Sequence, residues 1–567
     1  MTANSTDGTG LPKVTEWSEL APEYESLAKG PPAGAEEEWL SRWSRFSEGV
    51  AEAASWLSIR RSQDTADMDR RTEFLAYVKE VAPRIQEAEH RLKSALVSTG
   101  WSRPDMAPVL RRFRAATDLF REENLPLLAE ERALSTRYSE IVGGLQVDFQ
   151  GEKRTLAQLA PFRSMPDRGL REAAWRAGAE AMLGVRGELD ALFDELFALR
   201  KRIAANAGYT DYTDYRWQQL GRFDYTPAHA EEFHDAIRLA AVPALERASS
   251  ARAAALGVEV LRPWDVEVDP YGAEPLRPFD DGADLAAKAT AVFTRLDSGL
   301  GQMVQTMADE DLLDLDNRPG KAPGGYCATL AARRRPFIFM NAVGTEDNAR
   351  TMLHEAGHAF HVFLNAHQPY IWQRGAPMEF AEVASMSMEL LTSPYLEAAA
   401  GGFYTRREAI RSRTHHLDRM IRFLPYMATV SRFQHRLYAL GDQDHAQRDS
   451  LWSGLYGEYN VGVDWTGLEE TLSSLWHHKL HIFTVPFYYI EYGLAQMGAL
   501  QVWRNSLKDP DGALRAYRSA LALGGTRRLP DLFAAAGARL LFDKGGVDEL
   551  VTLAEEKLAD LRSQTAA

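Results

Sequence analysis

Cysteine is almost absent from this sequence, because Cys327 is the only one among 567 residues. A single thiol cannot form an intramolecular disulfide, and it cannot build a zinc site of several cysteines. The sequence is therefore compatible with a reducing compartment, and any bound metal must be held by other side chains.

Long apolar runs are also missing. The chain has no stretch of 18 consecutive apolar residues, which excludes an ordinary transmembrane helix. The start, MTANSTDGTGLPKVTEW, has neither a positively charged segment nor an apolar core, so no signal peptide is expected. We therefore expect a cytoplasmic protein without a membrane partner, with its first ten or so residues disordered.

Neither sign of charge is concentrated in a long run. The formal net charge is −15, which argues against nucleic acid as a partner, and the hydrophobic content of 45% is that of a soluble globular protein. No repeat of fixed period occurs, so repeat architectures are not expected. A length of 567 residues exceeds one ordinary core, so at least two lobes are expected.

Helical periodicity dominates the chain. Residues 36–199 are rich in Ala, Glu, Arg and Leu and contain a single histidine, His90. Short strands are expected within residues 257–278 and 317–341, where β-prone residues stand between turn formers. We expect a mainly α fold with a small sheet, divided into an N-terminal helical lobe at residues 1–199 and a second domain at residues 200–567.

The most informative stretch is HEAGHAFH, which runs from His354 to His361. A helix is expected over residues 345–367, since Thr345 can cap its start and Pro369 follows its end. On that helix His354 and His358 leave the same face one turn apart, with Glu355 beside them. This arrangement is typical of a zinc peptidase, and the alternative is a solvated helix face.

A catalytic zinc ion usually has three protein ligands, so one more is required. The metzincin pattern is excluded because Leu364 stands where it needs a histidine. Downstream, MEFAEVASMSMELL predicts a second helix on which Glu379 and Glu382 share a face. A His-His-Glu site of the thermolysin type would use Glu382 as the ligand and Glu379 to orient a ligand imidazole. Each glutamate is equally well explained as a solvated helix position.

A third cluster lies in LWHHKLHIFTVPFYYIEYGLAQMGAL, residues 475–500, and it contains His481, Tyr488, Tyr489 and Tyr492. Eleven of the fourteen histidines fall between residues 354 and 481, which locates the chemistry in this region. Aromatic runs commonly form core. The alternative is that these imidazole and phenol groups stabilise the oxyanion that forms when a peptide carbonyl is attacked.

Together, HEAGHAFH, EFAEVASMSME and HIFTVPFYYIEYGLAQ resemble the oligoendopeptidase F family of zinc metallopeptidases, relatives of thimet oligopeptidase. The segments GRFDYT, GGYCATL, PFIFMNAVGT and FQHRLY agree, so the resemblance covers roughly residues 200–567. It implies a two-lobed helical metallopeptidase with a small β-sheet beside the zinc-binding helix and a deep substrate channel. It also implies that PFIFMN is an edge strand along which a peptide lies.

The resemblance further implies a role for each residue of the site, with one zinc ion per chain. Zinc binds to His354, His358 and Glu382, Glu355 acts as general base, and the substrate carbonyl is contacted by His481 and by tyrosines among Tyr488, Tyr489 and Tyr492.

The expected function is hydrolysis of internal bonds in short peptides. One alternative is a dipeptidyl carboxypeptidase on the same zinc site, which would need a basic residue such as Arg374 or Arg422 to hold a terminal carboxylate. Another is a peptide-binding protein with structural zinc, although structural sites normally have four closed ligands. His361 lies near the site without being a ligand. The oligomeric state is not predicted.

Overall fold

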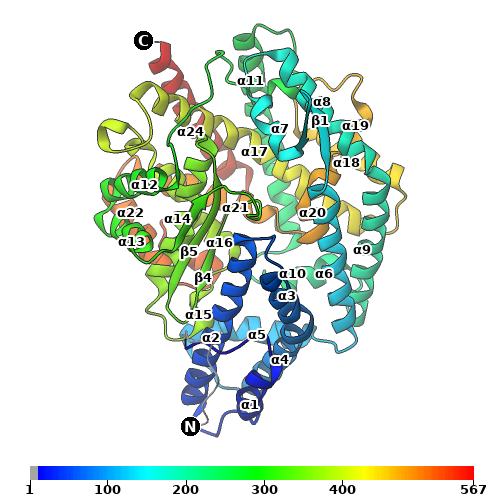
Figure 1. Cartoon of the computed structure of the whole chain (residues 1–567), viewed down its shortest axis with the longest axis vertical. Helices are drawn as coiled ribbons and strands as arrows, with labels where there is room; N and C mark the ends of the chain where they lie inside the picture. Colours follow the sequence, from blue (N-terminus) through cyan, green and yellow to red (C-terminus); the bar gives the residue numbers. More distant parts are fainter. Residues whose placement is uncertain (1–9, 567) are drawn as a thin grey trace. The chain divides into compact units, whose positions relative to one another are not determined.

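The structure is a computed structural model that describes residues 10–566 (Figure 1). The disorder expected for the first ten or so residues therefore falls almost wholly outside the described residues. The described part is mainly helical, with five short strands in two small sheets, which confirms the mainly α fold. None of its helices is both long enough and apolar enough to cross a membrane.

Contacts divide the chain into two compact units, each built from three segments. Unit 1 comprises Met1–Phe120, Arg277–Ala409 and Gly498–Leu540, and unit 2 comprises Arg121–Leu276, Ile410–Met497 and Leu541–Ala567. The boundary expected between residues 199 and 200 falls inside helix α9 (Arg186–Asn206), within unit 2. A functional division at that point stays a prediction.

Unit 1 begins with a helical bundle whose core is centred on Trp43. This side chain is fully buried and packs against Phe113 and Trp372, with ring centroids 5.5 Å and 4.1 Å away. The helices of unit 1 are α1 (Trp17–Leu27), α2 (Glu36–Gln63), α3 (Met68–Ala76), α4 (Ala82–Ser98), α5 (Ala107–Leu119), α12 (Gly282–Leu296), α13 (Ser298–Asp309), α14 (Glu346–Asn365), α15 (Ile371–Arg374), α16 (Met378–Leu391), α22 (Pro510–Ala522) and α23 (Leu529–Ala535).

The larger sheet lies in unit 1 and has the strand order β3-β5-β4. Its strands are β3 (Leu313–Asp316), β4 (Tyr326–Leu330) and β5 (Arg335–Ala342). Strand β5 pairs parallel with β3 and antiparallel with β4, and α14 packs against both β5 and β4 (Figure 1). The small sheet beside the motif helix is therefore confirmed. The expectation that PFIFMN is an edge strand is wrong, because β5 is central and both of its edges are paired.

Helix α14 forms where the sequence predicts it. The Thr345 side chain accepts a hydrogen bond from the Asn348 backbone N–H, and the Asn348 side-chain oxygen accepts one from the Thr345 backbone N–H in a capping box. The negative charges of Glu346 and Asp347 in the first turn stabilise the helix, because they lie at the positive end of its dipole. These contacts fix the start of the motif helix shortly after the end of β5.

Unit 2 holds most of the remaining helices and a two-stranded antiparallel sheet of β1 (Gln146–Phe149) and β2 (Glu152–Thr155). Along the chain, α17 and α21 run from one unit into the other. The further helices are α6 (Asn124–Gly143), α7 (Leu156–Arg163), α8 (Arg168–Gly184), α9, α10 (Tyr212–Gln219), α11 (Pro227–Leu256), α17 (Arg406–Leu440), α18 (His445–Tyr459), α19 (Glu469–Ser473), α20 (Leu480–Thr484), α21 (Ile490–Ser506) and α24 (Lys544–Ala566).

The strands expected within residues 257–278 do not form. That segment contains a short 3₁₀ turn at Pro263–Asp265 and a single bridge between Leu261 and Val463. Prolines at positions 263, 270, 275 and 278 lack the backbone N–H that a ladder requires, so an extended run cannot pair along its length.

Candidate metal centre and aromatic cluster

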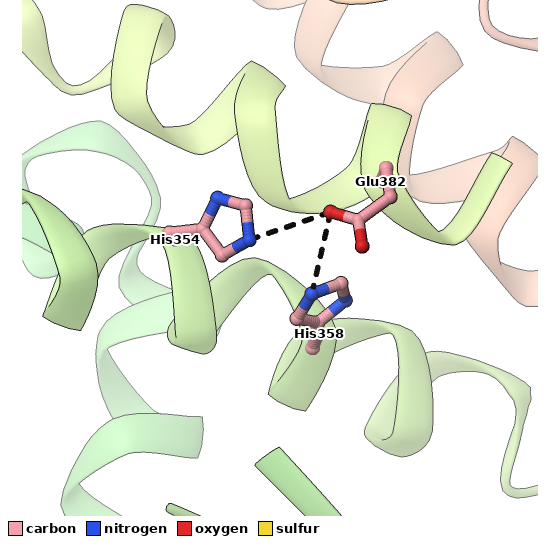
Figure 2. Close-up of side chains that lie close together, drawn as sticks. All are labelled: His354, His358 and Glu382. Atoms are coloured by element: carbon pink, nitrogen blue, oxygen red, sulfur yellow. Dashed lines mark ion pairs between the residues drawn. The ribbon is translucent and has the colours of Figure 1, made fainter. Parts of the chain in front are cut away.

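The two motif imidazoles and the predicted glutamate meet between α14 and α16. Figure 2 shows the side chains of His354 and His358 directed from α14 toward Glu382 on α16. Glu382 Oε2 lies 3.4 Å from His354 Nε2 and 3.7 Å from His358 Nε2. One ligand atom from each residue lies within 4.8 Å of the other two, and no other such group of three is found among residues 10–566.

These separations fit a zinc ion. Zinc bonds of about 2.0–2.2 Å in a tetrahedral site place neighbouring ligand atoms about 3.3 Å apart. The two nitrogen-to-oxygen distances, 3.4 Å and 3.7 Å, lie close to that value. Two imidazoles and one carboxylate also leave a fourth position open, as in catalytic rather than structural zinc sites.

A second carboxylate from α16 orients the first imidazole. Glu389 Oε1 lies 2.8 Å from His354 Nδ1, so the other ring nitrogen, Nε2, is directed at Glu382. Burial alone would lower the pKa of His354, but hydrogen bonds to Glu382 and Glu389 raise it well above its ordinary value. Such carboxylate–imidazole pairs fix the ring and increase its basicity as a ligand.

The geometry does not test the expectation that Glu379 orients a ligand imidazole. Glu379 is buried at the start of α16, whereas the carboxylate bound to a motif imidazole belongs to Glu389. The sequence holds a signal for Glu389, because it follows Glu382 by seven residues, which is two helical turns on one face. A role for Glu379 stays a prediction.

Glu355 is buried beside the ligands, with 7% of its surface exposed. Burial raises the pKa of its carboxyl group to about 7, assisted by the negative charges of Glu382 and Glu389, although the charge of His354 and a hydrogen bond from the Cys327 backbone act in the opposite direction. A carboxyl group with a pKa near neutrality can both accept and return a proton.

The close approach of α14 and α16 depends on Gly357. A Cβ atom at this position would lie 2.5 Å from the Ser385 Cα and 2.6 Å from the Ala384 carbonyl oxygen. The same carbonyl accepts a hydrogen bond of 2.8 Å from the Tyr517 hydroxyl of α22. The glycine within HEAGH therefore allows the backbone of α16 to lie against the motif helix.

His361 is buried one turn beyond His358, and its Nε2 has no hydrogen-bond partner. Its ring stands edge-on to Phe380 of α16, 6.1 Å away, and burial lowers its pKa to about 3. It is a neutral core histidine next to the site, and it lies outside the group of three.

The late aromatic segment forms a compact cluster within unit 2. The His481 ring lies 5.0–6.0 Å from the rings of Tyr488, Tyr489 and Tyr492. Tyr489 is buried and its hydroxyl accepts a hydrogen bond of 2.8 Å from Lys479 Nζ, while Tyr488 and Tyr492 are half-buried. No motif in the sequence indicates Lys479 as part of this cluster.

Two buried arginines hold this segment. Arg200 of α9 donates to the carbonyl oxygens of Ile482 and Phe483 at the end of α20. Arg222 donates to the Phe487 carbonyl and pairs with Glu491, each at 2.7 Å, and both side chains of this ion pair are almost fully buried. These contacts fix the turn between α20 and α21.

Phe487 in that turn has a positive φ of 63°, which is rare for a bulky residue. Its backbone N–H donates to the Gln434 side chain at 2.8 Å. A strained conformation costs about 1–3 kcal/mol and persists only where surrounding contacts impose it. The turn that separates His481 from the tyrosines is therefore imposed by the fold.

The two arginines suggested for binding a terminal carboxylate of the substrate both have partners within the fold. Arg374 pairs with Glu48 at 2.6 Å, and Arg422 pairs with Asp418 and donates to the Val266 carbonyl. Both arginines serve contacts within the fold.

Two parts of the chain match the patterns of known protein families. Residues 162–552 match the pattern of peptidase family M3, and residues 13–103 match the peptidase M3 N-terminal domain. The chromosomal oligoendopeptidase F of Lactococcus lactis subsp. cremoris is 24% identical over 307 residues, 53% of this chain and 49% of that protein. The match thus spans about half the length of that relative.

Solved structures match over almost the whole chain. PZ peptidase A with inhibitor 2 has 27% identity and a TM-score of 0.89, covering 96% of this chain and 97% of that chain. A structure with a provisional oligoendopeptidase F name has 28% identity, a TM-score of 0.89 and the same coverage. Since the family pattern spans well over half of the sequence, this chain belongs to peptidase family M3.

Proposed function

We propose that this protein is a zinc-dependent endopeptidase that hydrolyses internal bonds of short oligopeptides. The observation that carries the proposal is the group of His354, His358 and Glu382, with Glu355 buried on the same turn of α14. The oligoendopeptidase F name of several relatives supports the class of substrate.

His354, His358 and Glu382 would hold one zinc ion. When bound, zinc supplies a Lewis acid that polarises a peptide carbonyl and makes water acidic enough to react near neutral pH. Burial lowers the pKa of His358 to about 4, so this imidazole is neutral and able to act as a ligand.

Glu355 would act as the general base. Its carboxylate would accept a proton from the attacking water and pass it to the amine of the leaving product. The pKa of about 7 supports both halves of this transfer, because neither protonation state is strongly disfavoured near neutral pH.

His481 and the tyrosines would donate hydrogen bonds to the negative oxygen that develops on the attacked carbonyl. Burial and the charge of Lys479 lower the pKa of His481 to about 4, so the ring is neutral and keeps one N–H to donate. Partial exposure favours Tyr488 and Tyr492 over buried Tyr489 as donors. Removal of one such donor is expected to lower kcat about 10²–10³-fold.

The test of zinc binding uses neighbouring histidines on one helix. His358→Leu is expected to lose the zinc ion, whereas His361→Leu should keep about one zinc per chain, because His361 lies outside the ligand group. The zinc content of each variant is measured after gel filtration. Equal zinc in both variants would contradict the assignment of ligands.

The test of the base is Glu355→Gln, which keeps the shape of the side chain. Peptide cleavage should collapse while zinc content stays near that of the wild type. Retained activity would refute the role of Glu355.

Endopeptidase and exopeptidase activity differ in their need for a free terminus. An endopeptidase should cleave a peptide blocked at both ends about as well as the free form, whereas a dipeptidyl carboxypeptidase should not. The products are identified by mass spectrometry. A chelator that abolishes cleavage without unfolding the protein would exclude a non-catalytic peptide-binding protein with structural zinc.

A further inference from the structure

Lys479 lies next to the aromatic cluster of unit 2, at the start of α20. Its Nζ donates to the Tyr489 hydroxyl at 2.8 Å. The same atom lies 4.0 Å from the centre of the Tyr489 ring and 5.6 Å from that of Tyr426 on α17. The ammonium group therefore lies against two tyrosine side chains.

No carboxylate lies within 4.0 Å of this ammonium group among residues 10–566. Burial alone accounts for the lowering of the Lys479 pKa to about 8, as expected of a cation without an opposite charge nearby. Tyr489 does not provide that charge, since burial raises the pKa of its phenol well above the ordinary value and keeps it neutral.

Lys321 in unit 1 shows how this fold compensates a structural lysine. Its Nζ lies 2.9 Å from a carboxylate oxygen of Asp314, and it also donates to the carbonyl oxygens of Asp314 and Asp316 at 2.9 Å and 2.8 Å. All three donors are used and one partner is an anion. Lys479 has one neutral hydrogen-bond acceptor by comparison, which leaves donors and charge for a ligand.

This charge lies beside residues that belong to the proposed peptidase site. Lys479 precedes His481 by two residues and contacts Tyr489, and both belong to the cluster proposed to act on the substrate carbonyl. A half-buried cation without an anionic partner is costly in a protein interior, and such groups concentrate at binding and catalytic sites.

We propose that the Lys479 ammonium group binds a carboxylate of the peptide substrate, so that the enzyme prefers peptides that carry a negative charge at one position. The inference rests on the proposed peptidase function and adds a residue that determines specificity. The carboxylate is either the C-terminal group of the peptide or the side chain of an aspartate or glutamate, and both present the same chemistry to the lysine.

The experiment compares Lys479→Met with the wild type on matched peptides. One peptide has a free C-terminus, the second is its C-terminal amide, and the third has its acidic side chains changed to amides. Loss of a charge-assisted hydrogen bond should raise KM about 10-fold to 100-fold for the peptide that carries the bound carboxylate, with kcat within about twofold. The peptide whose neutralisation abolishes this difference identifies which carboxylate is bound.

Two further variants separate charge from packing. Lys479→Arg keeps the positive charge and should restore part of the preference for the charged peptide. Tyr426→Phe keeps the ring beside Lys479 and removes only a hydroxyl that makes no hydrogen bond to it, so the preference should stay as in the wild type. A loss that Lys479→Arg does not reduce, or that Tyr426→Phe shares, would point to packing and overturn the inference.

A binding measurement decides the inference independently of turnover. Fluorescence anisotropy with the Glu355→Gln protein should give a lower Kd for the charged peptide than for its neutral forms, and Lys479→Met in that background should abolish the difference. Equal binding of all peptides by both proteins overturns the role of Lys479 even if the wild type is an active peptidase. Absence of cleavage by the wild type overturns the proposed function and leaves the binding result to decide Lys479.

Discussion

The substitution Gly357→Ala tests whether the proposed zinc site depends on the contact between α14 and α16. The new Cβ would lie 2.5 Å from the Ser385 Cα, whereas carbon atoms in contact prefer about 3.5–4.0 Å. Relief of the overlap requires the two backbones to separate by about 1 Å. Overpacking of this kind costs about 1–3 kcal/mol of stability.

The effect on the metal should exceed the effect on stability. Ligand distances in a zinc site tolerate only about 0.2 Å, so a shift of about 1 Å would carry Glu382 out of bonding range of an ion held by His354 and His358. We expect the affinity for zinc to fall about 10-fold to 100-fold. Loss of a residue that supports a metal ligand typically has an effect of this size. Competition with a chromogenic chelator measures it, and circular dichroism checks that the fold is retained.

Gly454→Ala is the matched control. Gly454 lies within helix α18, and a Cβ there would meet no atom within 4 Å. This change should leave zinc affinity unchanged and stabilise the helix by up to about 1 kcal/mol. If Gly357→Ala binds zinc within twofold of the wild type and unfolds at the same temperature, the close contact does not set the position of Glu382.

Three further predictions concern single charged groups. Glu389→Gln weakens the hydrogen bond to His354 Nδ1, so zinc affinity should fall about 10-fold to 100-fold in the same competition assay, and an unchanged affinity would refute its orienting role. Glu491→Gln removes the carboxylate charge that pairs with the buried Arg222 guanidinium and should cost about 3–5 kcal/mol in urea unfolding, whereas a cost below 1 kcal/mol would contradict this reasoning. Burial alone would raise the pKa of Asp314, but hydrogen bonds from Arg318, Lys321 and Gln63 lower it to about 2. Because the folded pKa is lower than the unfolded value of about 3.9, Asp314 stabilises the protein by about 2–3 kcal/mol above pH 4, and this contribution is lost as pH falls toward 2. Asp314→Asn should flatten the dependence of the melting temperature on pH over this range.

The local part of the site could be predicted because it obeys helical periodicity. Two histidines four residues apart share a helix face wherever a helix forms, and the capping box at Thr345 ensures that one forms there. The His481 cluster was also identifiable, since His481 and the tyrosines lie within twelve residues of one another.

Strand pairing was not predictable in the same way. The run PFIFMN is β-prone whether it lies at an edge or at the centre of a sheet, so residue type alone did not distinguish the two positions. Its nearly continuous burial matches a central strand, a property that depends on the covering of both faces. The prolines of residues 257–278 were a clearer signal, and they outweighed the β-prone residues around them.

The sequence by itself determined the motif helix, its two histidines and the adjacent glutamate, because these depend on contacts within one or two turns of the chain. Tertiary structure decided which carboxylates of α16 serve the site, since Glu382 and Glu389 meet His354 only where Gly357 lets two helix backbones approach. It also decided that Lys479 has no anionic partner in the described chain, because an opposite charge can come from any distance along the sequence.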